Sequence, residues 1–134
     1  MKVVGLHRGG TTIAAGVFAR RRPVPRVVAP TPKEGGERVA EALAEAAERA
    51  EREAGVRGEA IGLGTPGPLD FRRGVIRFAP NIPGVQDFPI RRILEEATGR
   101  PVFLENDANA AALAEHHLGA AQGAESSLYL TVST

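Results

Sequence analysis

A short apolar segment that runs directly into polar residues and then into an alanine-rich helix constrains the fold of this chain most. Residues 102–104 (Val-Phe-Leu) read as a buried strand, residues 105–107 are Glu-Asn-Asp, and a helix is expected from near Asn106 to about Leu118. A strand that leads straight into a helix is typical of α/β proteins, in which ligands bind outside the carboxyl ends of the strands. The stretch therefore predicts both a layered α/β fold and the position of a site.

The rest of the chain alternates in the same way. Three consecutive strands are expected over residues 2–6, 11–18 and 24–29, separated by a Gly-Gly turn and an Arg-Arg-Arg-Pro turn. The later expected elements are a helix over 37–54, a strand over 60–63, a short strand over 74–78, a helix over 88–98 and a final strand over 127–133. This order predicts a mixed sheet that opens with an antiparallel three-stranded meander and carries helices on both faces.

Composition limits the classes of function. The chain has 134 residues, of which 25% are charged and 43% hydrophobic, and a formal net charge of +1. These values are ordinary for one soluble domain and give no electrostatic reason to expect nucleic-acid or membrane partners. With no long apolar run and no signal peptide, a cytoplasmic location is expected. Because the chain has no cysteine, we expect no disulfide, no thiolate nucleophile and no cysteine-based zinc site.

Asn106 and Asp107 are the first candidates for a functional role. One interpretation is structural: Asn106 caps the helix, and Asp107 interacts with the positive end of the helix dipole. The other is catalytic, because an ionised aspartate at a strand end can accept a proton from a substrate hydroxyl. The two interpretations are compatible. Glu105 is expected to be a satisfied or exposed strand-end carboxylate rather than a second catalytic acid.

Three further segments are expected to open on the same edge of the sheet. Gly9-Gly10-Thr11 lies in the first hairpin turn, where backbone N–H groups and a hydroxyl can bind phosphate. Residues 64–68 (Gly-Thr-Pro-Gly-Pro) follow a buried strand, and Asn81 lies on a second stiff loop, residues 79–84. Ordinary turn chemistry also explains each segment taken alone. The functional interpretation therefore depends on their convergence.

These segments, in this order, resemble the ROK family of sugar kinases and sugar-responsive repressors, and specifically its glucokinases. The matching parts are Gly9-Gly10-Thr11 with the strand 13–18, residues 64–68, residues 79–84, and residues 104–112 with Glu115 and Gly119. The resemblance implies an actin-like (ribonuclease H-like) ATPase fold. It also implies transfer of the ATP γ-phosphoryl group to the 6-hydroxyl of a hexose.

The resemblance assigns roles to individual residues. It implies that Asp107 is the general base and that Asn106 and Asn81 bind sugar hydroxyls. The implied lining of the sugar pocket is Gly64, Thr65, Pro66 and Gly67, and the implied phosphate contacts are Gly9, Gly10 and Thr11. ATP and Mg²⁺ are the implied cofactors of the complete enzyme. Such an enzyme depends mainly on positioning, on charge neutralisation and on an aspartate that orients the attacking hydroxyl.

The chain departs from the family pattern at three places. Family kinases have an Asp-x-Gly-Gly-Thr motif that helps to hold magnesium and phosphate, and here His7 stands at the Asp position, followed by Arg8. Magnesium prefers oxygen ligands, so histidine is a poor replacement, whereas Arg8 could contact a phosphate directly. Thr12 stands where the family often has Lys. The chain ends at Thr134, before the family's second Gly-rich phosphate loop and its His and Cys zinc motif.

Two hypotheses follow. In the first, residues 1–134 form a single domain, the N-terminal lobe of a ROK hexose kinase, which cannot catalyse phosphoryl transfer without a C-terminal lobe. In the second, the chain is a non-catalytic sugar-binding or protein-interaction module, which His7 favours. A ROK repressor is disfavoured because no helix-turn-helix precedes Lys2. We expect a homodimer, or pairing with a C-terminal lobe, because a lone lobe would expose an apolar face.

Overall fold

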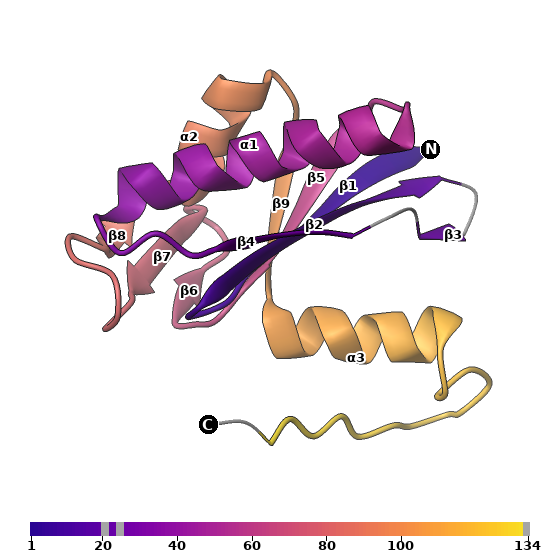
Figure 1. Ribbon diagram of the computed structural model, residues 1–134. Coiled ribbons are helices and arrows are strands. Elements are labelled where there is room, and N and C mark those ends of the chain that lie inside the picture. Colours follow the sequence, from indigo (N-terminus) through magenta and orange to yellow (C-terminus); the bar gives the residue numbers. More distant parts are fainter. Residues whose placement is uncertain (20–21, 24–25, 133–134) are drawn as a thin grey trace.

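The N-terminal strands form the antiparallel half of the main sheet (Figure 1). The computed structural model describes residues 1–19, 22–23 and 26–132. The strands of this half are β1 (Lys2–Arg8), β2 (Thr12–Ala19), β3 (Arg22–Pro23) and β4 (Val27–Pro30). β2 pairs antiparallel with β1, β3 and β4, which confirms the expected meander. Part of the expected third strand, residues 24 and 25, lies outside the described residues, as do residues 20 and 21 of the expected arginine turn.

The second half of the sheet is parallel. β5 (Ala60–Thr65) lies between β1 and β9 (Val102–Asn106), so the strand order is β3-β2-β1-β5-β9, with β4 also paired to β2. In register, His7 faces Gly64 and Gly64 faces Glu105. The carboxyl ends of the three parallel strands therefore meet at one edge of the sheet, as predicted.

Helices cover the sheet on two sides. α1 (Gly36–Ala54) and α2 (Ile90–Thr98) lie on one side of the sheet, and α3 (Asp107–Leu118) lies on the other (Figure 1). The core fills the space between the sheet and α1 and α2. Its fully buried side chains come from alternate strand positions and from one stripe of each of these two helices, and they include Val4, Ile13, Val17, Leu43, Ile61, Ile90 and Leu94.

A small sheet lies beside the main one and corrects one expected boundary. It consists of β6 (Leu69–Asp70), β7 (Val75–Phe78) and β8 (Gln86–Phe88). β7 is the short strand expected over 74–78. The helix expected from Phe88 begins two residues later, at Ile90. Phe88 is instead the last residue of β8, where it pairs with Ile76 of β7, and Pro89 takes the N-cap position of α2.

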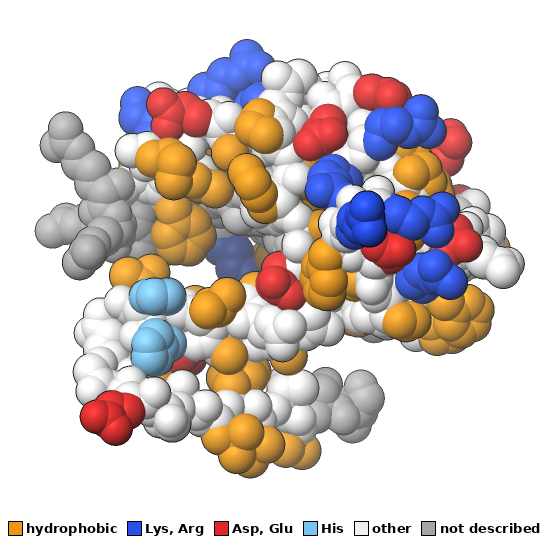
Figure 2. Space-filling model, turned by 180° about the vertical axis from the view of Figure 1, so that it is seen from behind, with side chains coloured by type: hydrophobic (Ala, Val, Ile, Leu, Met, Phe, Trp, Pro, Cys, Tyr) orange, Lys and Arg blue, Asp and Glu red, His pale blue; other side chains and the backbone are white. Residues whose placement is uncertain are grey.

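The strand expected over residues 127–133 is wrong for the part that the structure describes. Residues 127–132 have no regular secondary structure and run as an extended chain beside α3 (Figure 1). Leu128, Leu130 and Val132 are 82%, 75% and 98% exposed. Figure 2 shows hydrophobic side chains on this outer surface. The segment has the composition of a strand, but a strand also needs neighbouring backbone groups to pair with.

Among residues 1–19, 22–23 and 26–132, no helix is both long enough and apolar enough to cross a membrane.

Candidate functional site

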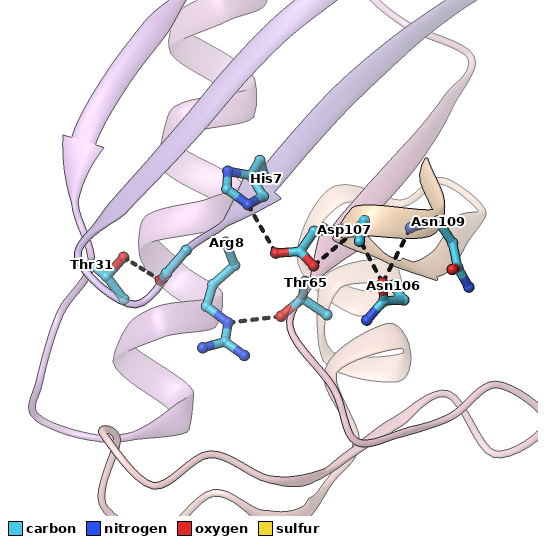
Figure 3. Close-up of polar contacts among 9 residues, drawn as sticks. His7, Arg8, Thr31, Thr65, Asn106, Asp107 and Asn109 are labelled. Carbon is cyan, nitrogen blue, oxygen red and sulfur yellow. Dashed lines mark hydrogen bonds and ion pairs between the residues drawn. The ribbon is translucent and has the colours of Figure 1, made fainter. Parts of the chain in front are cut away.

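The ends of β1, β5 and β9 bring together residues that are far apart in the sequence (Figure 3). His7 Nε2 lies 3.4 Å from Asp107 Oδ2, although the two residues are 100 positions apart. A Cβ atom built on Gly64 would lie 3.6 Å from Asp107 Cα, so the start of α3 packs directly against the end of β5. The predicted convergence is therefore present for Gly64 and Asp107.

The start of α3 fixes the orientation of Asn106 and Asp107. Asn106 Oδ1 accepts hydrogen bonds from the backbone N–H groups of Ala108 (3.0 Å) and Asn109 (3.2 Å), which confirms its role as the helix cap. Asp107 Oδ1 accepts from the N–H of Ala108 at 2.9 Å. Its other oxygen, Oδ2, faces His7, and the side chain is 30% exposed. The Ala108 N–H thus holds one oxygen of the Asp107 carboxylate, and the second oxygen stays accessible.

Glu105 belongs to the turn rather than to the open edge. Its Oε1 accepts from the backbone N–H of Asn106 (2.8 Å) and from Asn109 Nδ2 (3.2 Å). The carboxylate is therefore satisfied within the strand-to-helix turn, as expected. It stabilises the turn that carries Asn106 and Asp107.

Replacing Asn106 with alanine is expected to weaken the N-terminus of α3 locally. The change removes the acceptor for two backbone N–H groups and should lower the free energy of opening this helix by about 1 kcal/mol. The measurement is amide hydrogen exchange of residues 108–112, which should accelerate about fivefold. Asn106→Asp is the control, because it keeps an acceptor oxygen and should restore slow exchange. Equal exchange in wild type and Asn106→Ala would contradict the cap.

The Gly9-Gly10 turn is tightly closed. The N–H of Gly9 donates to the carbonyl of Thr12 at 2.8 Å, and Thr31 Oγ1 donates to the carbonyl of Gly9 at 2.9 Å. Lys33 Nζ donates to the carbonyl of Gly10 at 2.6 Å. A Cβ atom built on Gly10 would lie 3.9 Å from Asn81 Nδ2. The loop of Asn81 therefore reaches the turn that was predicted to contact phosphate.

The loop over residues 64–68 starts later than expected. β5 continues through Thr65, whose side chain is fully buried and points toward Arg8 (Figure 3). Gly67 forms a cis peptide with Pro68, and a Cβ atom built on Gly67 would lie 3.7 Å from Asn106 Nδ2. The Asn106 carboxamide thus faces the Gly67 part of the loop. The Thr65 side chain is buried and bonded to Arg8, so it anchors the start of this loop and does not lie at the open edge.

Arg8 is the residue whose structural role the sequence reasoning missed. It is only 4% exposed, and its Nε donates to Thr65 Oγ1 at 2.8 Å. Burial lowers the pKa of the Arg8 guanidinium, and the negative charge of Asp107 partly offsets this effect. A signal was present in the sequence, since Val4, Leu6 and Arg8 alternate on the same face of β1. That alternation places Arg8 on the face that carries the core.

The described residues at this edge offer few oxygen ligands for magnesium. Magnesium takes oxygen ligands, usually from one or two carboxylates. Around the turn the structure places His7, Arg8 and Lys33, which are nitrogen groups. Among the described residues, the carboxylate of Asp107 lies 3.4 Å from His7 and its charge acts on Arg8. Within the described ranges no group of three or more His, Asp or Glu side chains could hold a metal ion. The donor set favours anions over divalent cations.

Comparison with known proteins gives the family. Residues 3–134 match the ROK family. Glucokinase from Thermotoga maritima is 34% identical over 100% of this chain and 42% of its own length. A crystal structure of the ROK hexokinase from Thermus thermophilus has a TM-score of 0.87 and 89% identity, covering 92% of this chain and 41% of that one. A ROK family glucokinase from Streptomyces griseus, in complex with glucose and AMPPNP, has a TM-score of 0.83 and 38% identity, over 92% and 38% of the two chains.

The superpositions and the sheet order confirm the actin-like (ribonuclease H-like) α/β fold. The chain spans about two fifths of the length of the relatives it matches. With a family match over nearly all of its residues, the chain belongs to the ROK family.

Proposed function

We propose that residues 1–134 form one lobe of an ATP-dependent hexose kinase that phosphorylates the sugar 6-hydroxyl once a C-terminal lobe completes the site. The observation that carries this proposal is the position of Asp107 at the meeting point of three parallel strands. One of its oxygens is held by the helix start, and the other stays accessible. The ROK relatives named glucokinase or hexokinase support the same reaction.

In this proposal Asp107 acts as the general base. Its Oδ2 accepts the proton of the hexose 6-hydroxyl as the hydroxyl oxygen bonds to the γ-phosphorus of ATP, while the bond from that phosphorus to the bridging oxygen breaks and ADP leaves. The hydrogen bond from the Ala108 N–H holds the Asp107 carboxylate in one orientation. The base therefore does not have to search over its rotamers before it meets the sugar hydroxyl. An ionised carboxylate at a helix N-terminus is also favoured electrostatically.

The neighbouring residues bind the two substrates. Asn106 presents its carboxamide nitrogen toward the Gly67 loop, where it can donate to a sugar hydroxyl, and Asn81 can donate from the facing loop. Gly64, Pro66 and Gly67 line the sugar side, with Thr65 holding the loop from beneath. Gly9, Gly10 and Thr11 form the turn that would contact phosphate: the backbone N–H groups of Gly10 and Thr11 and the Thr11 hydroxyl would donate, while the Gly9 N–H is bonded to the carbonyl of Thr12. ATP supplies the phosphoryl group in the cytoplasm.

The lobe is incomplete as a catalyst. A kinase of this kind closes two lobes around its substrates, which excludes water and brings the phosphoryl group to the attacking hydroxyl. The exposed apolar side chains of α3 and of residues 128–132 are where we propose that the C-terminal lobe, or a second copy in a homodimer, packs.

A coupled assay with glucose and magnesium-ATP tests the proposal. We expect no turnover from the 134-residue chain alone. We expect turnover from a chimera in which this chain is joined to the part of the Thermus thermophilus relative that lies beyond the matched segment, because the two lobes then close around both substrates. Turnover by the chain alone would overturn the proposed incompleteness. A folded chimera that binds neither glucose nor ATP would overturn the proposed function.

A non-catalytic sugar-binding module is the second candidate, and one observation favours it. His7 lies 3.4 Å from Asp107 Oδ2, the oxygen that the kinase reaction needs. If the lobe is a kinase weakened by this histidine, His7→Asp in the chimera should raise kcat/KM for magnesium-ATP at least about tenfold, the effect of gaining one charged hydrogen-bonding group. Lys2→Arg, at the far end of β1, is the control and should leave the rate unchanged. Glucose binding without turnover, both in the parent chimera and in its His7→Asp variant, would favour the binding module.

A further inference from the structure

One edge of the main sheet stays open in the described part of the chain. β4 pairs with β2 on one side and with no described strand on the other, and α1 contacts β4 on the side of the sheet that carries the core (Figure 1). Between β4 and α1 lies a groove of about 470 Å³. An unpaired strand edge presents N–H and C=O groups to solvent and can pair with another strand. The groove and this edge are therefore a candidate interaction surface.

The floor of the groove is apolar and its rim is charged. Val27 and Ala29 of β4 line the floor, while Val28, on the opposite face of the strand, is 48% exposed. Ala42 and Ala46 of α1 complete the floor, and their small side chains leave room for an approaching chain. The charged residues that line the groove are Lys33, Glu34, Arg38, Glu45 and Arg49.

Four of these charges are arranged so that the groove is complementary to itself. Arg38 follows Glu34 by four positions, and Arg49 follows Glu45 by the same interval. Reading this order backwards exchanges every acid with a base. In a second copy that lies antiparallel across the groove, Glu34 would therefore face Arg49, and Arg38 would face Glu45. Opposite charges that meet in this way fix the orientation of two surfaces and disfavour other arrangements.

We propose that this groove binds a second copy of the chain in a two-fold dimer, in which β4 pairs antiparallel with its copy. The same two-fold axis makes the two α1 helices antiparallel, as the order of the charges requires. Pairing uses the free β4 edge of both copies, so the contact closes on itself. The shortness of β4, which ends at Pro30, limits pairing with unrelated strands. The proposed kinase reaction does not depend on this contact.

Sedimentation equilibrium of the 134-residue chain measures the association. We expect a species of twice the mass of one chain, with a Kd of about 100 μM or tighter. Arg38 and Glu45 also contact each other within one chain at 3.4 Å, so the test uses the outer pair, Glu34 and Arg49. Arg49→Glu or Glu34→Arg alone places like charges opposite each other twice per dimer and should raise Kd at least about tenfold. An equimolar mixture of the two variants should dimerise again with about the wild-type Kd, because both pairs are then opposite in charge.

Arg52→Glu is the matched control, because Arg52 lies on the same helix, pairs with Glu48 at 3.8 Å and lies outside the groove. It should dimerise like wild type. At concentrations where wild type is monomeric, every variant should melt within about 3 °C of it, since exposed ion pairs contribute little to stability. Three results would each overturn the inference: a wild-type chain that is monomeric at about 1 mM, a dimer whose Kd neither single reversal changes, or folded variants that do not dimerise when mixed. The coupled kinase assay of the chimera tests the proposed function separately.

Discussion

Asp107→Asn is expected to lower kcat of the chimera by about 10²- to 10⁴-fold, the usual contribution of a positioned general base. The amide keeps the size and shape of the side chain and can still accept from Ala108 N–H through its oxygen. It loses the charge and the basicity at the atom that faces the open edge. Initial rates in a coupled assay, with the melting temperature of the variant measured alongside, give the comparison.

A second aspartate provides the control for that variant. Asp87 lies on β8, pairs with Arg77 at 3.0 Å and has a φ of 47°, a conformation that asparagine also tolerates. Asp87→Asn should therefore leave kcat within about a factor of two of the parent, because ion pairs of this exposed kind contribute little. A chimera that keeps more than half of its kcat after Asp107→Asn would show that Asp107 is only a helix-start residue.

Leu43→Ala is expected to reduce the free energy of unfolding by about 2–5 kcal/mol. Leu43 is fully buried on the face of α1 that packs against the sheet, among small alanines that cannot move to fill a cavity. Urea unfolding of the 134-residue chain measures the effect. A loss of this size is a large part of the stability of an ordinary domain.

The same substitution on α3 serves as the comparison. Leu113 is 53% exposed, and α3 has no buried residues. Leu113→Ala should change the free energy of unfolding by less than about 1 kcal/mol, because little apolar surface is lost from a packed interior. Equal losses at the two positions would mean that the core does not lie between α1 and the sheet.

Local patterns in the sequence predicted the elements that have a clear stop signal or a continuous run of apolar residues. The helix expected over 37–54 became α1, and its end falls at Gly55, whose φ of 65° suits glycine. The parallel strands were predicted from their continuous apolar runs. Two predictions failed where a local pattern fits more than one structure. Phe88 suits a strand as well as a helix, and residues 128–132 suit a strand that has no partner in the described chain.

The sequence predicted where the site lies, at the carboxyl ends of the parallel strands, better than it predicted which side chains contact one another there. The convergence of strand ends follows from topology, and Asn106 as a cap follows from its place before an alanine-rich helix. The contacts of His7 with Asp107 and of Gly10 with Asn81 join segments that are far apart in the sequence. They depend on how the strands and loops are placed relative to one another, which local sequence patterns do not determine. Arg8 was considered only as a phosphate contact, because a charge is ordinarily expected at the surface. Alternation along β1 carried the information that it is buried.

The most direct test of the proposed role of this lobe is a crystal structure of the chimera with glucose bound. The glucose 6-oxygen should lie within hydrogen-bond distance of Asp107 Oδ2, about 2.6–3.2 Å, with Asn106 bonded to a second hydroxyl. Glucose bound away from the ends of β1, β5 and β9, or a 6-oxygen more than about 5 Å from the Asp107 carboxylate, would contradict the assignment of this edge as the hexose site.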